Sequence, residues 1–320
     1  MIAVDSIIDS RERKELAEAF AERRWALAPP APSQGRFRAL FSAWEIDAVC
    51  RFVPLAGVED FRLHFHGMRV KDSAYRDAQG RVAPALVRDL VASGVSLNMS
   101  RIENYSNAVL ALSRILEAEL RAPIQINFYH TPQQGQGLGS HIDDHDVLVL
   151  QLQGQKQWQL DGAGVQRTLI LNAGDWLYLP RGIRHDVRNC GLIPSAHFTV
   201  GFHRERKPSA FRAFAAQIAA GEVPDRDALE AADADTVFEW RGQTVTVTAS
   251  ENTLQLDLAY RRSPLRLYSE LEPIVERMAQ AARFRPRDLG FEDIDAVASL
   301  GRFLACGGFL SLAALPVPSP

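Results

Sequence analysis

The feature that most constrains the fold of this chain is a series of short apolar or alternating segments between residues 124 and 203. Each segment is long enough for one β-strand. Gly, Pro, Asn and Asp separate the segments, as in Asn172-Ala173-Gly174-Asp175 and Pro180-Arg181-Gly182. The segments are 124–130, 141–152, 155–160, 166–171, 176–180, 185–189 and 196–203. Because many short strands at this spacing are typical of a β-sandwich or β-barrel, we predict such a core here.

Helical patterns flank the β-rich region on both sides. Residues 11–26 have amphipathic spacing, and the prolines of 29–32 interrupt them as a linker would. Residues 61–66 alternate as in a strand, and residues 104–121 carry apolar side chains at helical spacing. Beyond the β-rich region the patterns predict helices over 209–220, 270–282 and 292–306, and strands within 237–258. We therefore expect a β core with helical additions before it and a smaller mixed region after it.

Composition excludes several classes of partner. The chain is 47% hydrophobic and 23% charged with a net charge of -3, so no basic excess indicates nucleic-acid binding. No apolar run approaches the ~20 residues that a membrane helix needs. The first residues lack the basic-then-apolar order of a signal peptide. Cys50, Cys190 and Cys306 are far apart and odd in number, so we expect reduced thiols in a cytoplasmic protein.

An H-x-D pair, His141 and Asp143, indicates a metal site. Residues two apart on an extended strand face the same side, so both side chains can reach one ion. A second imidazole comes from His185, which begins a later strand after the turn at 180–182. Two neutral imidazoles and one carboxylate form the facial triad of non-haem Fe(II) oxygenases, which leaves the remaining coordination positions open. An isolated H-x-D is weak evidence, but with the later strand and turn the metal interpretation is favoured.

The other histidines compete with this assignment. His145 shares strand parity with His141 and Asp143, so it is expected near the pocket, in contact with substrate rather than as a ligand. The remaining five are predicted to be strand or surface residues: His64, His66, His130, His197 and His203.

The segment 155–160 predicts a lysine on the inner face of a strand. Gln155, Gln157 and Gln159 face one way, so Lys156 faces the other way with Trp158 and Leu160. A buried ammonium is costly without a partner, and that face of the strand carries no acidic residue. Either Lys156 extends its ammonium to the barrel rim, or it meets the carboxylate of a bound ligand.

Three segments together resemble the cupin-type ribosomal oxygenases of the JmjC superfamily. The segments are 125–158, which holds the H-x-D pair and Lys156, then 173–180 and 199–202. The resemblance implies a mainly β chain with a double-stranded β-helix core and N-terminal helical additions. It implies an N-terminal extension and catalytic domain over 1–205, a helical region over 206–234 and a winged-helix-like domain over 235–320. In the family the helical region dimerises, so a homodimer is expected, with apolar helical positions at 211, 214, 215 and 218.

The resemblance also implies an activity and its co-substrate contacts. It implies an enzyme that uses Fe(II), 2-oxoglutarate and O2 to hydroxylate a side chain of a polypeptide, with release of succinate and CO2. His141, Asp143 and His185 would hold the iron, and Lys156 would bind the distal carboxylate of 2-oxoglutarate. Asn127 and Thr199 resemble further polar contacts to the co-substrate, and Tyr129 is a weaker pocket candidate. A ribosomal protein and a natural-product precursor peptide are both possible substrates.

Two alternatives remain open at the level of sequence. One is a cupin enzyme that uses its metal without 2-oxoglutarate and has no need for Lys156. The other is a non-catalytic cupin sensor or binding module, against which the complete triad argues.

Overall fold

The structure is a computed structural model. It describes residues 7–27, 35–37, 40–55, 60–133, 135–162, 164–203, 225–241, 245–250, 253–258 and 264–313. The predicted linker at 29–32 and the predicted helix at 209–220, with positions 211, 214, 215 and 218, lie outside these residues. None of the helices that the structure describes is long and apolar enough to cross a membrane.

The β-rich region folds into two antiparallel sheets that face each other. From β5 to β12 consecutive strands pass from one sheet to the other, except that β8 and β9 pair in the same sheet, and this is the connectivity of a double-stranded β-helix. One sheet has the order β1-β10-β7-β12-β5-β4-β2-β3, and the other has the order β6-β11-β8-β9. The barrel strands are β5 (Ile124–Thr131), β6 (His141–Ile142), β7 (Asp146–Gln153), β8 (Gln155–Gly162), β9 (Val165–Asn172), β10 (Trp176–Leu179), β11 (Arg184–Asn189) and β12 (Ser195–Phe202). The predicted cupin-type fold is confirmed.

Burial along the strands explains why these segments form a barrel. β7 is buried at every position except its last, because one face meets helices and the other lines the barrel. β8 alternates between exposed or half-buried glutamines and the buried Lys156, Trp158 and Leu160, as predicted. The four-stranded sheet therefore has one face toward solvent and one face toward the barrel interior.

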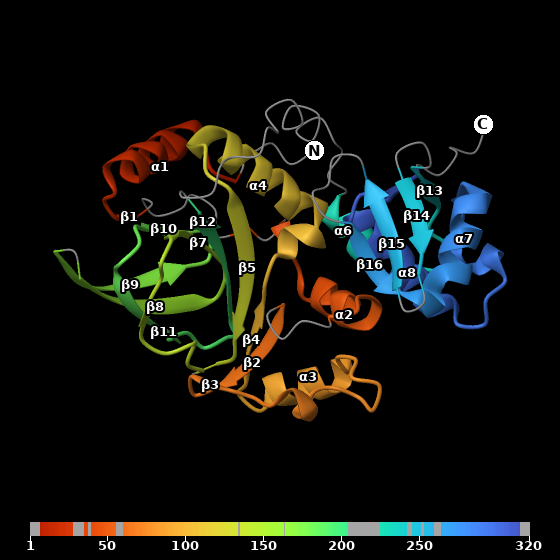
Figure 1. Ribbon diagram of the computed structural model, residues 1–320, viewed down its shortest axis with the longest axis horizontal. Helices are drawn as coiled ribbons and strands as arrows, with labels where there is room; N and C mark the ends of the chain where they lie inside the picture. Colours follow the sequence, from red (N-terminus) through yellow and green to blue (C-terminus); the bar gives the residue numbers. More distant parts are fainter. Residues whose placement is uncertain are drawn as a thin grey trace.

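Two hydrophobic clusters hold the sheets. A small cluster fills the barrel between the sheets and includes Val149, Trp158, Leu177 and Val187. A larger cluster lies on the outer face of the eight-stranded sheet, where α1 and α4 cover it, and continues through α2 and α8 (Figure 1). Apolar side chains thus fill the barrel interior at one level, and polar side chains line it at another level.

The N-terminal part extends the larger sheet and covers it. Glu12 of α1 forms a capping box with Asp9 and accepts a hydrogen bond from Trp176 Nε1 of β10 at 3.3 Å, which ties the helix to the barrel. The elements are α1 (Ser10–Glu22), β1 (Ala26–Leu27), α2 (Ala43–Phe52), β2 (Phe61–Phe65), β3 (Met68–Arg69), α3 (Pro84–Ala92), β4 (Ser96–Met99) and α4 (Asn107–Leu120), with 3-10 turns at Asp72–Ala74 and Ile102–Asn104.

The C-terminal part forms two three-stranded antiparallel sheets with helices, on the side of α2 away from the barrel (Figure 1). The sheet orders are β17-β13-β18 and β14-β15-β16. The elements are α6 (Arg226–Glu230), β13 (Phe238–Trp240), β14 (Val245–Ala249), β15 (Thr253–Leu258), β16 (Leu265–Tyr268), α7 (Glu272–Ala281), β17 (Arg283–Phe284), α8 (Ile294–Cys306) and β18 (Leu310–Leu312), with 3-10 turns at Ser269–Leu271 and Pro286–Leu289. The winged-helix interpretation of this part stays a prediction.

Two element boundaries differ from the sequence expectation. The segment 141–152, predicted as one run, is interrupted after Ile142 by a turn, and β7 begins only at Asp146. The amphipathic segment 11–26 ends as a helix at Glu22, and Ala26 and Leu27 then pair with β10 as a sheet edge. In both places pairing with a distant strand overrides the local pattern.

Candidate metal and co-substrate site

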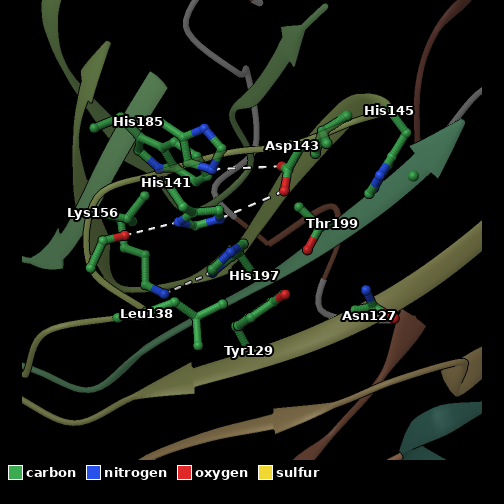
Figure 2. Close-up of a pocket in the computed structure, with 16 residues that line it drawn as sticks. Asn127, Tyr129, Leu138, His141, Asp143, His145, Lys156, His185, His197 and Thr199 are labelled. Carbon is green, nitrogen blue, oxygen red and sulfur yellow. Dashed lines mark hydrogen bonds and ion pairs between the residues drawn. The ribbon is translucent and has the colours of Figure 1, made fainter. Parts of the chain in front are cut away.

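His141, Asp143 and His185 converge inside the barrel (Figure 2). Each offers one ligand atom, and these atoms lie within 4.8 Å of one another. The Nε2 atom of His141 lies 3.7 Å from Asp143 Oδ1, and the Nε2 atom of His185 lies 3.6 Å from Asp143 Oδ2. The two imidazoles therefore face one carboxylate from either side, as predicted.

Backbone contacts orient these three side chains. His141 and His185 are direct cross-strand partners of β6 and β11, so their side chains lie on the same face. The Nδ1 atoms lie near backbone carbonyls, His141 at 2.9 Å from Gly139 O and His185 at 3.2 Å from Ile183 O. Donation to those oxygens places the proton on Nδ1 and leaves each Nε2 lone pair toward Asp143. The backbone of Asp143 is itself held, because Gly182 N donates to its carbonyl oxygen at 3.2 Å.

The chemistry of the donor set fits a divalent transition metal. Burial, and then the nearby His141, lowers the pKa of His185, so this imidazole is neutral at ordinary pH. A neutral imidazole is the form that ligates. Two imidazole nitrogens and one carboxylate on one side of an ion suit iron, with open positions for other ligands.

A cavity that is open on one side surrounds this cluster, and its empty space, including the part open to solvent, is about 600 Å³. Its lining includes every residue that the sequence indicated for the metal or the co-substrate: Asn127, Tyr129, His141, Asp143, Lys156, His185 and Thr199. The cavity has a closed end and an open end. Lys156 and His197 are 1% and 4% exposed, whereas the side chains of His141 and Asp143 are 37% and 25% exposed.

Lys156 lies at the closed end with its ammonium in the cavity wall (Figure 2). Its Nζ donates a hydrogen bond to His197 Nδ1 at 2.8 Å, and no acidic group among the described residues contacts this ammonium. Burial lowers its pKa to about 7. The alternative in which Lys156 extends to the barrel rim is wrong, because the side chain is enclosed. A charged ligand is the partner that this position lacks.

His197 is the residue that sequence reasoning missed. We expected an ordinary strand or surface histidine, but it is buried at the closed end, where its ring stacks on Tyr129 with centroids 4.9 Å apart. Burial, and then the neighbouring Lys156, lowers its pKa well below the usual value, so the ring is neutral and accepts from Lys156. One sequence signal existed, because His197 shares strand parity with Thr199, which was expected to face inward.

Asn127, Tyr129 and Thr199 lie together on the inner face of the larger sheet. Thr199 is the cross-strand partner of Asn127, and Tyr129 is the partner of His197. The Thr199 hydroxyl is buried beside the Tyr129 phenol and makes no hydrogen bond of good geometry among the described residues. Burial raises the pKa of Tyr129, so its phenol keeps its proton and can donate. A buried hydroxyl without a partner is costly, which fits a polar ligand in this cavity.

Of the other histidines, one lines the cavity, as its position along the strand predicts, and others lie away from it. His145 lines the open end, as expected from its parity with His141 and Asp143. It is not part of the cluster of possible ligands found among the described residues. His64, His66 and His130 do not line this cavity.

Comparison with known proteins agrees with this geometry. Residues 101–170 and 163–209 match the family described as "JmjC domain". The matched residues contain the whole His141, Asp143 and His185 cluster together with Lys156. These residues of the chain are therefore similar to a JmjC domain. They span β5 to β12, so the family match and the double-stranded β-helix coincide.

Curated relatives match part of this chain. Ribosomal oxygenase 1 of Gallus gallus is 29% identical over 237 residues, which cover 61% of this chain and 38% of the relative. The bifunctional lysine-specific demethylase and histidyl-hydroxylase NO66 of Dictyostelium discoideum is 32% identical over 143 residues, which cover 38% of this chain and 28% of the relative. The chain thus spans less than two fifths of the length of these curated relatives. The crystal structure of the Escherichia coli ribosomal oxygenase YcfD aligns with 92% of this chain and 98% of its own, at 17% identity and a TM-score of 0.38.

Proposed function

We propose that this protein is an Fe(II)- and 2-oxoglutarate-dependent oxygenase that hydroxylates an amino-acid side chain of a protein or peptide. The observation that carries the proposal is the pairing of two features in one cavity. A facial set of two imidazoles and a carboxylate lies beside an enclosed lysine that contacts no acidic group among the described residues. A dicarboxylate fits both features, because one end chelates a metal and the other end meets an ammonium. The relatives named as ribosomal oxygenase and histidyl-hydroxylase support a polypeptide substrate.

Iron bound by the triad would supply the O2 activation that couples decarboxylation of 2-oxoglutarate to hydroxylation of a C–H bond. His141, Asp143 and His185 would hold that ion, because backbone contacts fix the two imidazole rings and the turn that carries Asp143. Lys156 would bind the distal carboxylate, and His197 accepts a hydrogen bond from Lys156 Nζ and so fixes the direction of the ammonium. Trp158, Val147 and Val187 line the same cavity and keep water from the closed end.

The test is the release of succinate. The purified protein incubated with Fe(II), 2-oxoglutarate and O2 is expected to form succinate, and Asp143→Ala is expected to abolish this while the melting temperature stays close to that of the wild type. Candidate peptides then gain the mass of one oxygen atom. A cupin enzyme that does not use 2-oxoglutarate would turn over without any oxo-acid, and a binding module would form no succinate; either result contradicts the proposal.

We further propose a cytoplasmic homodimer with domain boundaries at 205/206 and 234/235. The three cysteines are free, which agrees with a reducing compartment. The proposal of a dimer rests on the helical apolar pattern at 211, 214, 215 and 218, which the structure does not describe. A monomeric mass by light scattering at micromolar concentration would contradict it.

A further inference from the structure

His197 and Lys156 lie together at the closed end of the cavity (Figure 2). Both side chains are almost fully enclosed, so a ligand that extends inward from the metal cluster ends against these two groups. Lys156 contributes the charge that a distal carboxylate needs. The ring of His197 contributes volume, and volume at the end of a cavity limits the length of the ligand that fits.

Three contacts hold the His197 ring in one position. The ring stacks on Tyr129, with centroids 4.9 Å apart and planes 9° apart. It meets the ring of Trp158 edge-on, with centroids 5.7 Å apart. Its Nδ1 accepts a hydrogen bond from Lys156 Nζ at 2.8 Å. Because turning the ring would break the stacking and leave a buried amine without its acceptor, the ring does not move aside for a longer ligand.

The β7 side of the ring is closed as well. His197 is the cross-strand partner of Gln151, directly after a shift in the register between β12 and β7. Such irregularities re-aim side chains next to sites. Gln151 is 0% exposed, and its Nε2 donates to Gln153 O at 2.8 Å and to Ser195 Oγ at 2.7 Å. These neighbours are fixed, so space freed by shortening His197 would add to the cavity that its ring lines.

We propose that His197 sets the length of the oxo-acid that the cavity accepts. With the ring in place, 2-oxoglutarate fits between the metal cluster and Lys156, and 2-oxoadipate, which has one more methylene, does not. This rests on the proposed function, because it assigns the closed end of the same cavity to the distal carboxylate. His197 selects through its volume, and its hydrogen bond to Lys156 contributes separately to the affinity for either ligand.

The experiment compares the dissociation constants of 2-oxoglutarate and 2-oxoadipate by isothermal titration of the Mn(II) protein without O2. A methylene that does not fit a closed pocket weakens binding roughly 10- to 200-fold, so the wild type is expected to prefer 2-oxoglutarate by a factor in this range. His197→Ala, which removes the ring, is expected to bind the two ligands about equally. His197→Phe, which keeps an aromatic ring and lacks the acceptor, is expected to bind both ligands more weakly and to keep the preference.

A second small variant and a control guard against misfolding. His197→Asn shortens the side chain and keeps an acceptor, so it should lose the preference as His197→Ala does, and it decides the outcome if His197→Ala does not fold. His66→Ala, which changes an exposed histidine outside the cavity, is expected to keep the wild-type preference. The melting temperature and the Mn(II) affinity of each variant show whether the fold and the metal cluster are intact.

The possible results separate this inference from the proposed function. A wild type that binds both ligands equally, or a preference that persists in the folded small variants, contradicts the inference. Loss of the preference in His197→Phe contradicts it too, because the hydrogen bond rather than the volume would then select. In each case, binding of 2-oxoglutarate by the wild-type Mn(II) protein leaves the proposed function intact. A wild type that binds neither oxo-acid contradicts the proposed function itself.

Discussion

At the scale of single residues, the environment of Lys156 predicts its contribution to co-substrate binding. Lys156→Ala removes the only lysine or arginine among the described residues that line the cavity and would leave a carboxylate there without a partner. Such a truncation costs ~2–5 kcal/mol, so the dissociation constant for 2-oxoglutarate should rise roughly 30-fold to several thousand-fold. Isothermal titration of the Mn(II) protein measures it, and Mn(II) affinity should stay nearly unchanged.

The same strand offers a matched control. Gln157→Ala alters the neighbouring residue on the solvent face of β8 and should leave 2-oxoglutarate binding unchanged. Lys156→Arg keeps the charge with different reach and should restore binding only in part. Unaltered affinity in Lys156→Ala would show that the co-substrate, if any, binds elsewhere.

Burial of Lys156 also predicts a pH dependence of that binding. In the free protein its pKa is lowered to about 7 by burial, whereas a bound carboxylate favours the charged ammonium and raises it again. Below pH 7 the amine is already charged and this group adds no pH dependence. Above pH 7 binding takes up a proton, so affinity should fall by about tenfold per pH unit.

Calorimetry in two buffers of different ionisation enthalpy measures this proton uptake. At pH 8 the wild type should take up close to one proton per 2-oxoglutarate bound. Lys156→Arg, whose guanidinium stays charged throughout this range, should take up none at this group. Affinity that rises between pH 7 and 9 would contradict the assigned role of Lys156.

At the scale of elements, the turn between β7 and β8 determines where Lys156 lies. Gly154 has φ +65, and a Cβ there would lie 2.6 Å from Pro194 O, a backbone atom that cannot move aside easily. Gly154→Ala should therefore destabilise the fold by ~1–3 kcal/mol, read as a lower midpoint in urea, and should also weaken 2-oxoglutarate binding. Gly80→Ala is the control, because Gly80 has φ +76 but open space around its Cβ position. Equal losses in both variants would assign the effect to φ alone.

The sequence predicts the position of a strand where polar and apolar residues alternate and where a Gly, Pro, Asn or Asp ends the segment. β8, β9 and β11 match their predicted segments within two residues, and β8 and β11 alternate between buried residues and more exposed ones. The prediction of one strand over 141–152 was wrong, because the turn after Ile142 depends on the contact of Gly182, distant in sequence, with Asp143. His197 was missed because only the fold brings β12 beside Lys156. One sheet of the C-terminal part combines strands far apart in sequence, such as β13 with β18, and no local pattern predicts that pairing.

At the scale of the whole molecule, a buried polar cluster joins the N-terminal part to the C-terminal part. Arg226 of α6 forms an ion pair with Glu45 of α2, and its guanidinium also donates to the carbonyl oxygen of Leu40. Cys306 of α8 lies with its thiol 2.8 Å from Glu45 Oε1, so three elements meet at one carboxylate. Glu45 is 1% exposed, which makes this carboxylate depend on its partners.

Arg226→Met should therefore weaken the attachment of the C-terminal part rather than the barrel itself. Removing one partner of a buried ion pair costs ~3–5 kcal/mol, and the loss should appear in urea as an early transition of the C-terminal tryptophan, Trp240, ahead of the barrel.

Arg81→Ala is the matched control. Arg81 pairs with Glu270 across the same two parts, but both side chains are about half exposed, so its loss should cost less than ~1 kcal/mol. Lys156 and the metal cluster lie in the barrel, on β6, β8, β11 and the turn after β6. Binding of Mn(II) and 2-oxoglutarate by Arg226→Met should therefore persist at urea concentrations where the C-terminal part has unfolded. A single transition in which binding and Trp240 fluorescence are lost together would show instead that the two parts fold as one unit.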